Sequence, residues 1–283
     1  MKNNKDFYRI LFGLILILCT SCANLKKVND FSSSSLQSIK NFENIDYSFN
    51  QACNDAGKLE RIRNAQFVLD TSKFDCGSNR IADSITLVIY NSIKGYFDGL
   101  TNLSNNDLTN YKLDTLATAF IKANVSDSSA SAYAKISNIL FRTITNEYRK
   151  KKIQQYIGEA NDAIKVLLNN LSFQLNQNLN GKLKIQEQKL TSIYYDLFQK
   201  ANSPYEKLVI SREYDMKIAS LKNKEEQITS FAIGLQKISD GHQKLYEDRN
   251  KLTEKKFKDL ISGYSSSIQD INAKFNKIKA SKQ

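Results

Sequence analysis

The chain has 283 residues and a formal net charge of +12, with 41 lysines and arginines against 29 acidic residues. It contains one proline, one histidine and no tryptophan. The length fits one large or two small domains. One proline, together with long apolar patterns of period 3.6, predicts an all-helical protein and excludes a fold built mainly from strands.

The first 22 residues carry the most specific pattern in the chain. Lys2, Lys5 and Arg9 precede nine residues without a polar side chain (10–18), and small residues then lead to Cys22. This is the layout of a secretory signal peptide. The apolar run is too short to stay as a membrane helix, which needs roughly 20 apolar residues. The alternative is a plain signal peptide with an incidental cysteine.

Small residues that end in a cysteine resemble the lipobox of bacterial lipoproteins, although position 19 is Cys where that family prefers an aliphatic residue. The resemblance implies that the signal peptide, residues 1–21, is removed and that Cys22 is the lipid-attachment site, with palmitate or similar acyl chains. Two or more such chains anchor a protein stably to a membrane. By resemblance to lipoprotein sorting, Ala23 and the lack of acidic residues after it imply an outer-membrane location facing the periplasm.

Two cysteines remain after cleavage, Cys53 and Cys76. In an oxidising envelope such a pair predicts a disulfide. It would close a loop of about 24 residues and stabilise the fold by about 3 kcal/mol. The alternatives are a zinc site, which would need two more ligands, and a redox pair, which is normally spaced Cys-x-x-Cys.

The mature chain is expected to begin with a lipidated flexible tether over residues 22–36, which are polar and rich in serine. An N-terminal helical subdomain that contains the disulfide is expected over 37–125. Its first helix is predicted over 36–56, with Gly57 ending or bending it, before a second short helix.

The most apolar mature segment is Ile81 to Leu100, which predicts a buried central helix. A membrane-inserting segment like those of helical pore-forming toxins is the alternative. A further short helix is expected over 111–123.

Residues 126–283 are predicted to form a long antiparallel coiled-coil hairpin, which makes the molecule an elongated helical bundle. The turn is expected at Ser203, which would cap a helix beginning at Pro204, with Glu206 completing a capping box. The second arm is expected to continue through a stutter near Lys255 to residue 280. Antiparallel arms would place residues whose numbers sum to about 406 side by side, and glycines in the arms predict bends or breaks.

The chain offers few residues for catalysis. His242 lies in the apolar stripe of the second arm, without a paired metal ligand, serine elbow or Gly-rich phosphate loop elsewhere in the sequence. We interpret it as a packed histidine. Carboxylates lie among lysines on helix faces, whereas acid–base catalysis needs opposed groups in a cleft. We therefore expect no enzyme activity, cofactor, metal or small-molecule substrate.

Two basic runs are candidate sites for anionic envelope polymers, because a polybasic patch is attracted to anionic surfaces. They consist of Arg149, Lys150, Lys151 and Lys152, and of Lys255, Lys256 and Lys258. Interspersed acidic residues make a solvated helix face the alternative, and nucleic acid is not expected in this compartment.

The sequence predicts a non-catalytic lipoprotein of the cell envelope. It would be anchored by its N-terminal lipid and act as a structural or protein-interaction module, through a helical hairpin that contacts a protein partner or a second copy. The alternatives are a membrane-active protein whose segment Ile85 to Phe97 unpacks, and a binder of anionic polymers.

Overall fold

The computed structural model describes residues 22–64, 74–105, 127–142, 149–252 and 254–280. All secondary structure in these ranges is helical, so the prediction of an all-α bundle is confirmed. The expected helix over 111–123 lies outside the described residues. The elements are α2 (Cys22–Lys40), the 3₁₀ turn η1 (Asn41–Asn44), α3 (Phe49–Arg63), α4 (Gly77–Ser104), α5 (Asp127–Arg142), α6 (Arg149–Phe173), the π-helical turn η3 (Gln174–Leu179), α7 (Asn180–Lys200), α8 (Pro204–Glu247), the 3₁₀ turn η4 (Arg249–Lys251) and α9 (Lys255–Ala280).

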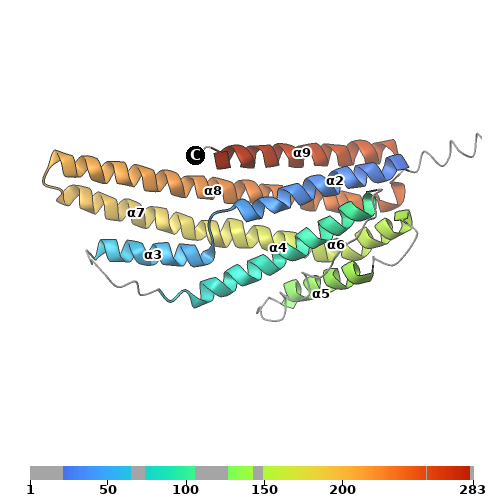
Figure 1. The fold of residues 1–283 in the computed structure, drawn as a ribbon, viewed down its shortest axis with the longest axis horizontal. Helices are drawn as coiled ribbons and strands as arrows, with labels where there is room; N and C mark the ends of the chain where they lie inside the picture. The colour runs from blue at the N-terminus through green and yellow to red at the C-terminus, as the bar shows by residue number, and fades with distance from the viewer. Residues whose placement is uncertain (1–21, 65–73, 106–126, 143–148, 253, 281–283) are drawn as a thin grey trace, which may run out of the picture.

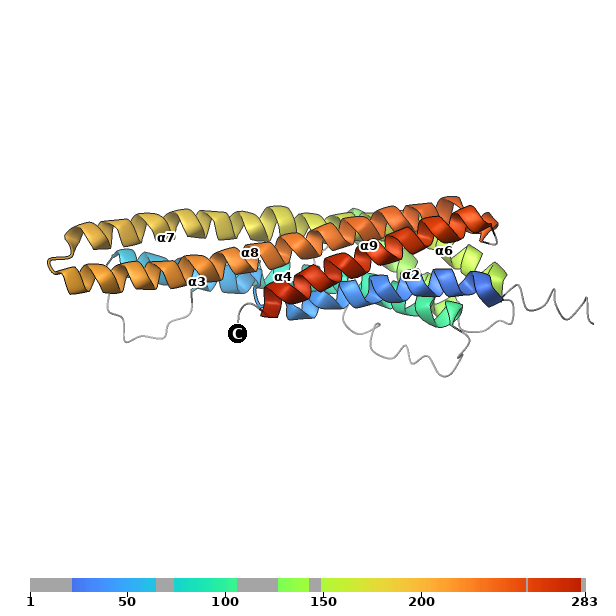
Figure 2. The ribbon, with the colours of Figure 1, turned by 90° about the horizontal axis from the view of Figure 1, so that it is seen from above.

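Helix α8 is the longest element, with 44 residues, and the other helices are arranged along it (Figure 1). On one side, α6, η3 and α7 form an almost continuous rod that runs antiparallel to α8. On the other side, α9 returns along α8 with α2 beside it (Figure 2). Helix α4 packs against α2 and α6, α5 packs against α6 and α4, and α3 lies beside α7.

The turn between α7 and α8 forms as the sequence predicted. The Ser203 hydroxyl accepts a hydrogen bond from the backbone N–H of Glu206 (3.1 Å), and the Glu206 carboxylate accepts one from the backbone N–H of Ser203 (3.2 Å). Pro204 occupies the first turn, where its missing N–H leaves no intrahelical hydrogen bond unmade. Because these contacts are local, they define where α8 begins.

Contacts between the two arms follow the expected antiparallel register. Asn180 donates a hydrogen bond to Thr229 (3.0 Å), and the hydroxyl oxygens of Thr191 and Tyr214 lie 3.2 Å apart. The residue numbers in each pair add to within about three of 406. That these arms act as one coiled-coil hairpin remains a prediction.

The expected course of the second arm was wrong. Helix α8 ends at Glu247, and the chain reverses through η4 instead of continuing through a stutter. Asn223 of α8 donates a hydrogen bond to the carbonyl oxygen of Ile278, and Lys237 of α8 stacks over the ring of Tyr264, so α9 runs antiparallel to α8. An apolar pattern with steps of three and four shows that a segment is helical, but it does not show in which direction the next helix runs. The phase slip near Lys255 coincides with the reversal of the chain.

Helices also replace two features expected near the N-terminus. Residues 22–36 form the first turns of α2, where Val28 and Phe31 are fully buried, and are not a flexible tether. Gly57 lies inside α3 instead of ending a helix. The ring of Phe74 covers Gly57 so closely that a Cβ atom there would lie 2.5 Å from it. Close packing, and not a helix end, therefore accounts for this glycine.

The prediction that Ile81 to Leu100 forms a buried central helix is confirmed by α4. Its residues Ile93, Tyr96, Phe97 and Leu100 are completely buried in a hydrophobic core shared by all the long helices. The other face of α4 is open to solvent, as Ile81 and Leu87 are about half exposed.

Two glycines allow the helices beside α8 to approach it closely. Gly234 faces Ser38 of α2, and Gly241 faces the ring of Phe31. Helix α8 continues through both residues, so neither glycine breaks the helix. Their function in the fold is close helix packing.

Gly241→Ala is expected to destabilise the protein, because the added Cβ would lie 2.5 Å from the Phe31 ring and 3.2 Å from Tyr264. Overpacking of this kind costs about 1–3 kcal/mol. The matched control is Gly263→Ala on the exposed face of α9, where nothing lies within 4 Å of the new methyl group. That control should stabilise the helix by about 0.4–1 kcal/mol. Urea unfolding measures both, and equal shifts in the two variants would contradict the close approach of α2 to α8.

Candidate functional site

The two predicted basic runs lie at the same end of the bundle. Helix α6 begins with the first run and α9 begins with the second, and both helices start at the right-hand end of Figure 1. Gln154, one turn into α6, donates a hydrogen bond to the carbonyl oxygen of Arg249 in the turn before α9 (2.9 Å). We call these seven residues the basic end: Arg149, Lys150, Lys151, Lys152, Lys255, Lys256 and Lys258.

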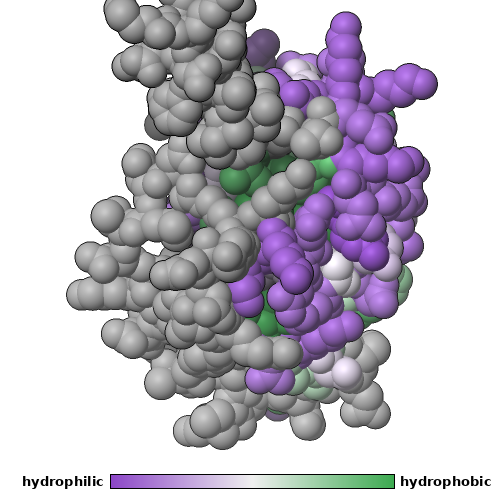
Figure 3. Space-filling model, turned by 90° about the vertical axis from the view of Figure 1, so that its right-hand side faces the viewer, coloured by the Kyte–Doolittle hydropathy of each residue, from purple (hydrophilic) through white to green (hydrophobic). Residues whose placement is uncertain are grey.

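Side chains of the basic end lack acidic partners in the part of the chain that the structure describes. Lys151, Lys255 and Lys256 are exposed, Lys152 and Lys258 are half-buried, and none of the five forms an ion pair with a described residue. For Arg149 and Lys150 only the backbone is described. Figure 3 views the molecule from this end and shows hydrophilic side chains over most of its described surface.

Three neighbouring cations at this end already have a partner, whereas Lys26 of α2 is exposed and forms no ion pair with a described residue. Lys27 lies 3.5 Å from Asp30, Lys244 forms an ion pair with Glu247, and Arg249 stacks over the ring of Tyr246. The positive charge that remains available at this end therefore lies mainly in the two predicted runs, with Lys26 beside them.

The predicted lipid-attachment residue, Cys22, is the first residue of α2 and lies at the same end of the bundle (Figure 2). Only its backbone is described. The sequence placed Cys22 and the basic runs in separate segments, and only the packing of α2 beside α9 brings them together.

The opposite end of the bundle carries exposed apolar side chains that the sequence analysis missed. Tyr205 is 75% exposed, Leu208 63% and Met216 61%, and Val209 beside them is 45% exposed. At spacings of three, four and seven residues, these side chains share one face of the first turns of α8. We call these four residues the distal stripe. They lie between Pro204 and Leu221, the first buried residue of α8. Reading the period of apolar residues from Pro204 onward would have found them.

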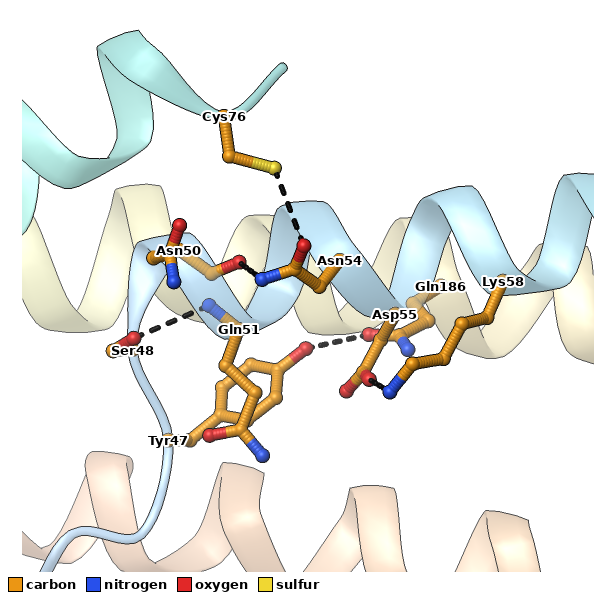
Figure 4. A network of polar contacts seen from close by, with 9 residues as sticks. All are labelled: Tyr47, Ser48, Asn50, Gln51, Asn54, Asp55, Lys58, Cys76 and Gln186. Carbon is orange, nitrogen blue, oxygen red and sulfur yellow. Dashed lines mark hydrogen bonds and ion pairs between the residues drawn. The ribbon is translucent and has the colours of Figure 1, made fainter. Parts of the chain in front are cut away.

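The predicted disulfide is confirmed: Cys53 of α3 and Cys76, just before α4, are joined with their Cα atoms 5.9 Å apart. Around it, polar contacts fix the start of α3 (Figure 4). Ser48 caps α3 by accepting a hydrogen bond from the N–H of Gln51 (3.2 Å), and Tyr47 donates one to Gln186 of α7 (2.6 Å). The disulfide and this network hold α3 between α4 and α7, which is a structural role.

His242 is a packed residue, as interpreted from the sequence. It is 2% exposed, and its Nε2 atom lies 2.6 Å from the hydroxyl oxygen of Tyr96. Burial lowers the pKa of His242 to about 3 and raises the pKa of Tyr96 well above its usual value. The imidazole is therefore neutral at physiological pH and has no route to solvent, so it fits a role in packing.

A cleft of about 270 Å³ lies where α3, α4 and η3 meet, and its lining is mostly apolar. Its one carboxylate, Asp83, accepts hydrogen bonds from the backbone N–H groups of Phe49 (2.8 Å) and Asn50 (2.9 Å). These bonds cap the start of α3. Because the carboxylate serves the fold, it is not placed for acid–base chemistry on a substrate.

The described ranges contain no cluster of three or more His, Cys, Asp or Glu side chains suited to hold a metal ion. Among the same residues, no helix has both the length and the apolar character that a membrane crossing needs.

No protein-family model, curated protein or solved structure matches this chain significantly.

Removing the disulfide with Cys53→Ser and Cys76→Ser should lower the free energy of unfolding by about 3 kcal/mol, because the unfolded chain gains the entropy of an open loop. The measurement is urea unfolding of the double variant and of the oxidised protein. Treating the parent protein with a reductant should give the same loss. A double variant as stable as the oxidised parent would show that the cross-link adds nothing to the stability of the fold.

Stability should fall as the pH drops below about 6.5, the pKa of an unperturbed histidine. Between that pH and about 3, the unfolded chain binds a proton at His242 that the folded protein does not. This group alone contributes a slope of up to about 1.4 kcal/mol for each pH unit. The test compares urea unfolding of the parent and of His242→Gln from pH 7.5 to 4.5. The difference between them should shrink or reverse toward low pH, and parallel curves would contradict a neutral buried imidazole.

Proposed function

We propose that this protein is a non-catalytic lipoprotein of the cell envelope, anchored through Cys22, that holds the distal stripe away from the membrane to bind a protein partner. The observation that carries the proposal is that the start of α2 and the turn between α7 and α8 lie at opposite ends of the bundle (Figures 1 and 2). At 1.5 Å per residue, the 44 residues of α8 span about 66 Å. A lipid at one end would therefore leave the other end far from the bilayer.

The chemistry of the distal end supports a protein partner better than a polyanion. Residues 190–217, on either side of the turn between α7 and α8, contain four cations and four acidic residues, so this segment has no net formal charge. Burying each large apolar side chain of the distal stripe against a partner would contribute about 1.5–3 kcal/mol. An exposed apolar patch bordered by polar residues is typical of a protein interaction site.

The predicted coiled-coil hairpin supplies the structural part of the proposal. Helix α9 ends at Ala280, close to Asn223 of α8, so the first turns of α8 lie beyond it. Over those turns α8 packs on α7, where the rings of Tyr194 and Tyr214 lie 6.0 Å apart. We propose that this two-helix segment acts as one rigid projection.

The membrane-active alternative receives less support. The segment from Ile85 to Phe97 belongs to α4, whose buried face forms part of the central core. Tyr96 is completely buried, with its ring stacked 4.8 Å from that of Tyr156 in α6. Unpacking this helix would expose much of the core, at a cost comparable to the total stability of a typical domain.

The proposal is tested with a photo-crosslinking amino acid at Leu208 in the distal stripe, in cells that make the lipidated protein. The matched control position is Ile233, which is 52% exposed on the same helix. We expect a defined crosslinked species from position 208 only, and its loss when Met216→Glu is added. Both substituted side chains are exposed, so stability should change by less than about 0.5 kcal/mol.

The mass of the crosslinked species separates the two kinds of partner, since twice the chain mass means a second copy. Identical products from positions 208 and 233, or none from either, would reject the distal stripe as the binding surface. Membrane anchoring is tested separately by Cys22→Ser, which should leave the protein unprocessed or release it from the membrane fraction. Unchanged processing and membrane partition in that variant would reject the anchor.

A further inference from the structure

Helix α2 continues directly from the predicted lipid-attachment residue into the bundle, so a lipid on Cys22 would hold the bundle close to the membrane. Helix α2 begins at Cys22, and six residues later Val28 is completely buried in the bundle. Six helical residues span about 9 Å. An acyl anchor on Cys22, which is part of the proposed function, would therefore hold the end of the bundle directly against the lipid headgroups.

Helices α2 and α9 run parallel, and their register places the basic end beside Cys22. Gln269 donates a hydrogen bond to Ser34 and Lys279 donates one to Asn44, and in both pairs the residue numbers differ by 235. The same offset sets Cys22 level with residue 257, in the middle of the second basic run. The first run reaches the same end through the hydrogen bond from Gln154 of α6 to Arg249 before α9.

The charge at this end exceeds what its own acidic residues can neutralise. Residues 244–259 contain six cations and four acidic residues, and residues 149–152 add four cations and no acid. The acidic residues Glu247 and Asp248 already pair with Lys244 and Lys251, which lie outside the two runs. Glu254 and Asp259 lie in the same segment, but none of the described cations of the basic end forms an ion pair with a described residue. Both runs lie at the end of the bundle where the anchor would be.

We propose that the basic end binds the anionic headgroups of phospholipids and forms a second membrane contact beside the lipidated Cys22. The contact is electrostatic, so it acts only within about 8–10 Å of the surface at ordinary salt concentrations. Of the two ends, only the basic end lies close enough, because the distal stripe is separated from it by the length of α8. Two contacts at one end hold the bundle upright, whereas a single acyl anchor leaves it free to tilt.

Phospholipid fits this surface better than a soluble envelope polymer does. The cations lie in the first turns of two helices that start at the same end of the bundle, so they are gathered at one end and do not continue along its side. A flat headgroup layer meets such a face with many phosphates at once. A linear polyanion is better matched by cations that continue along the side of a bundle.

The test uses the full mature chain with Cys22→Ser, so that no acyl chain contributes, and measures sedimentation with large vesicles. One set of vesicles contains only phosphatidylcholine, and the other contains about 30% phosphatidylglycerol, enough to give a clearly anionic surface. We expect binding to the anionic vesicles only, with weaker binding as salt is added.

The triple variant Lys151→Glu, Lys255→Glu, Lys256→Glu changes three exposed side chains. Because each cation contributes roughly a fivefold factor near such a surface, the variant should bind about 100-fold more weakly.

The matched control reverses the same number of charges away from this end, with Lys182→Glu, Lys200→Glu and Lys222→Glu, all three exposed. It should keep most of the binding. Equal loss in both triple variants would mean that only the net charge matters and would overturn the proposed surface. Circular dichroism and thermal unfolding check that both variants fold, and the salt dependence of the parent protein gives a readout that needs no variant.

Two further outcomes would also overturn the proposal: equal binding to both kinds of vesicle, and binding of soluble lipopolysaccharide without binding to anionic vesicles. The second result would assign the basic end to a polymer instead. Since the experiment uses neither the acyl chain nor the distal stripe, its failure leaves the anchoring and crosslinking tests of the proposed function unaffected.

Discussion

A cluster of aromatic rings around His242 joins helices from four separate parts of the chain, and the arrangement of the bundle depends on it. The ring of His242 in α8 lies 5.3 Å from that of Tyr96 and 6.1 Å from that of Phe97, both in α4. Phe31 of α2 packs edge-on against Phe97, and Tyr156 of α6 stacks on Tyr96. Because all five side chains are at least 98% buried, each helix can reach the cluster only in one register. A neutral imidazole suits this site, since a charged one would need a buried partner.

This cluster determines what happens at the two ends of the molecule. By holding α2 at Phe31, nine residues after Cys22, it makes the start of α2 part of the rigid bundle. At the other end, α8 extends beyond α9 and is supported mainly by α7, so the apolar side chains of the distal stripe stay exposed. One end therefore carries the two basic runs and Cys22, and the other carries the exposed apolar side chains of the distal stripe. Such a division suits a molecule that binds a membrane and a protein at the same time.

Features of the fold that depend on neighbouring residues could be predicted from the sequence. Features that depend on contacts between distant segments could not. The capping box at Ser203 involves residues three positions apart, so the turn into α8 could be placed from the sequence alone. The reversal after Glu247 depends on α9 finding a buried surface on α2 and α8, and nothing in its apolar repeat distinguishes that from a continuing arm. The serine-rich composition of residues 22–36 suggested flexibility. In the structure, Ser32 and Ser35 are completely buried, because their small side chains let α2 pack closely against its neighbours.

The residues of the candidate site could be named from the sequence, but their arrangement at one end of the bundle could not, because it depends on contacts between distant segments. The two basic runs were recognised as separate segments about 100 residues apart, each with a solvated helix face as its alternative. The reversal between α8 and α9 places both runs at one end of the bundle, because α9 then starts beside the start of α6. A straight second arm in the predicted register would also have set Lys255 level with Lys151, because their numbers add to 406, but along the side of a longer hairpin instead of at an end of the bundle. The reversal that periodicity could not detect lets α9 run parallel to α2, which sets the second run level with Cys22. The proposed membrane contact at this end therefore depends on that reversal as much as on the lysines themselves.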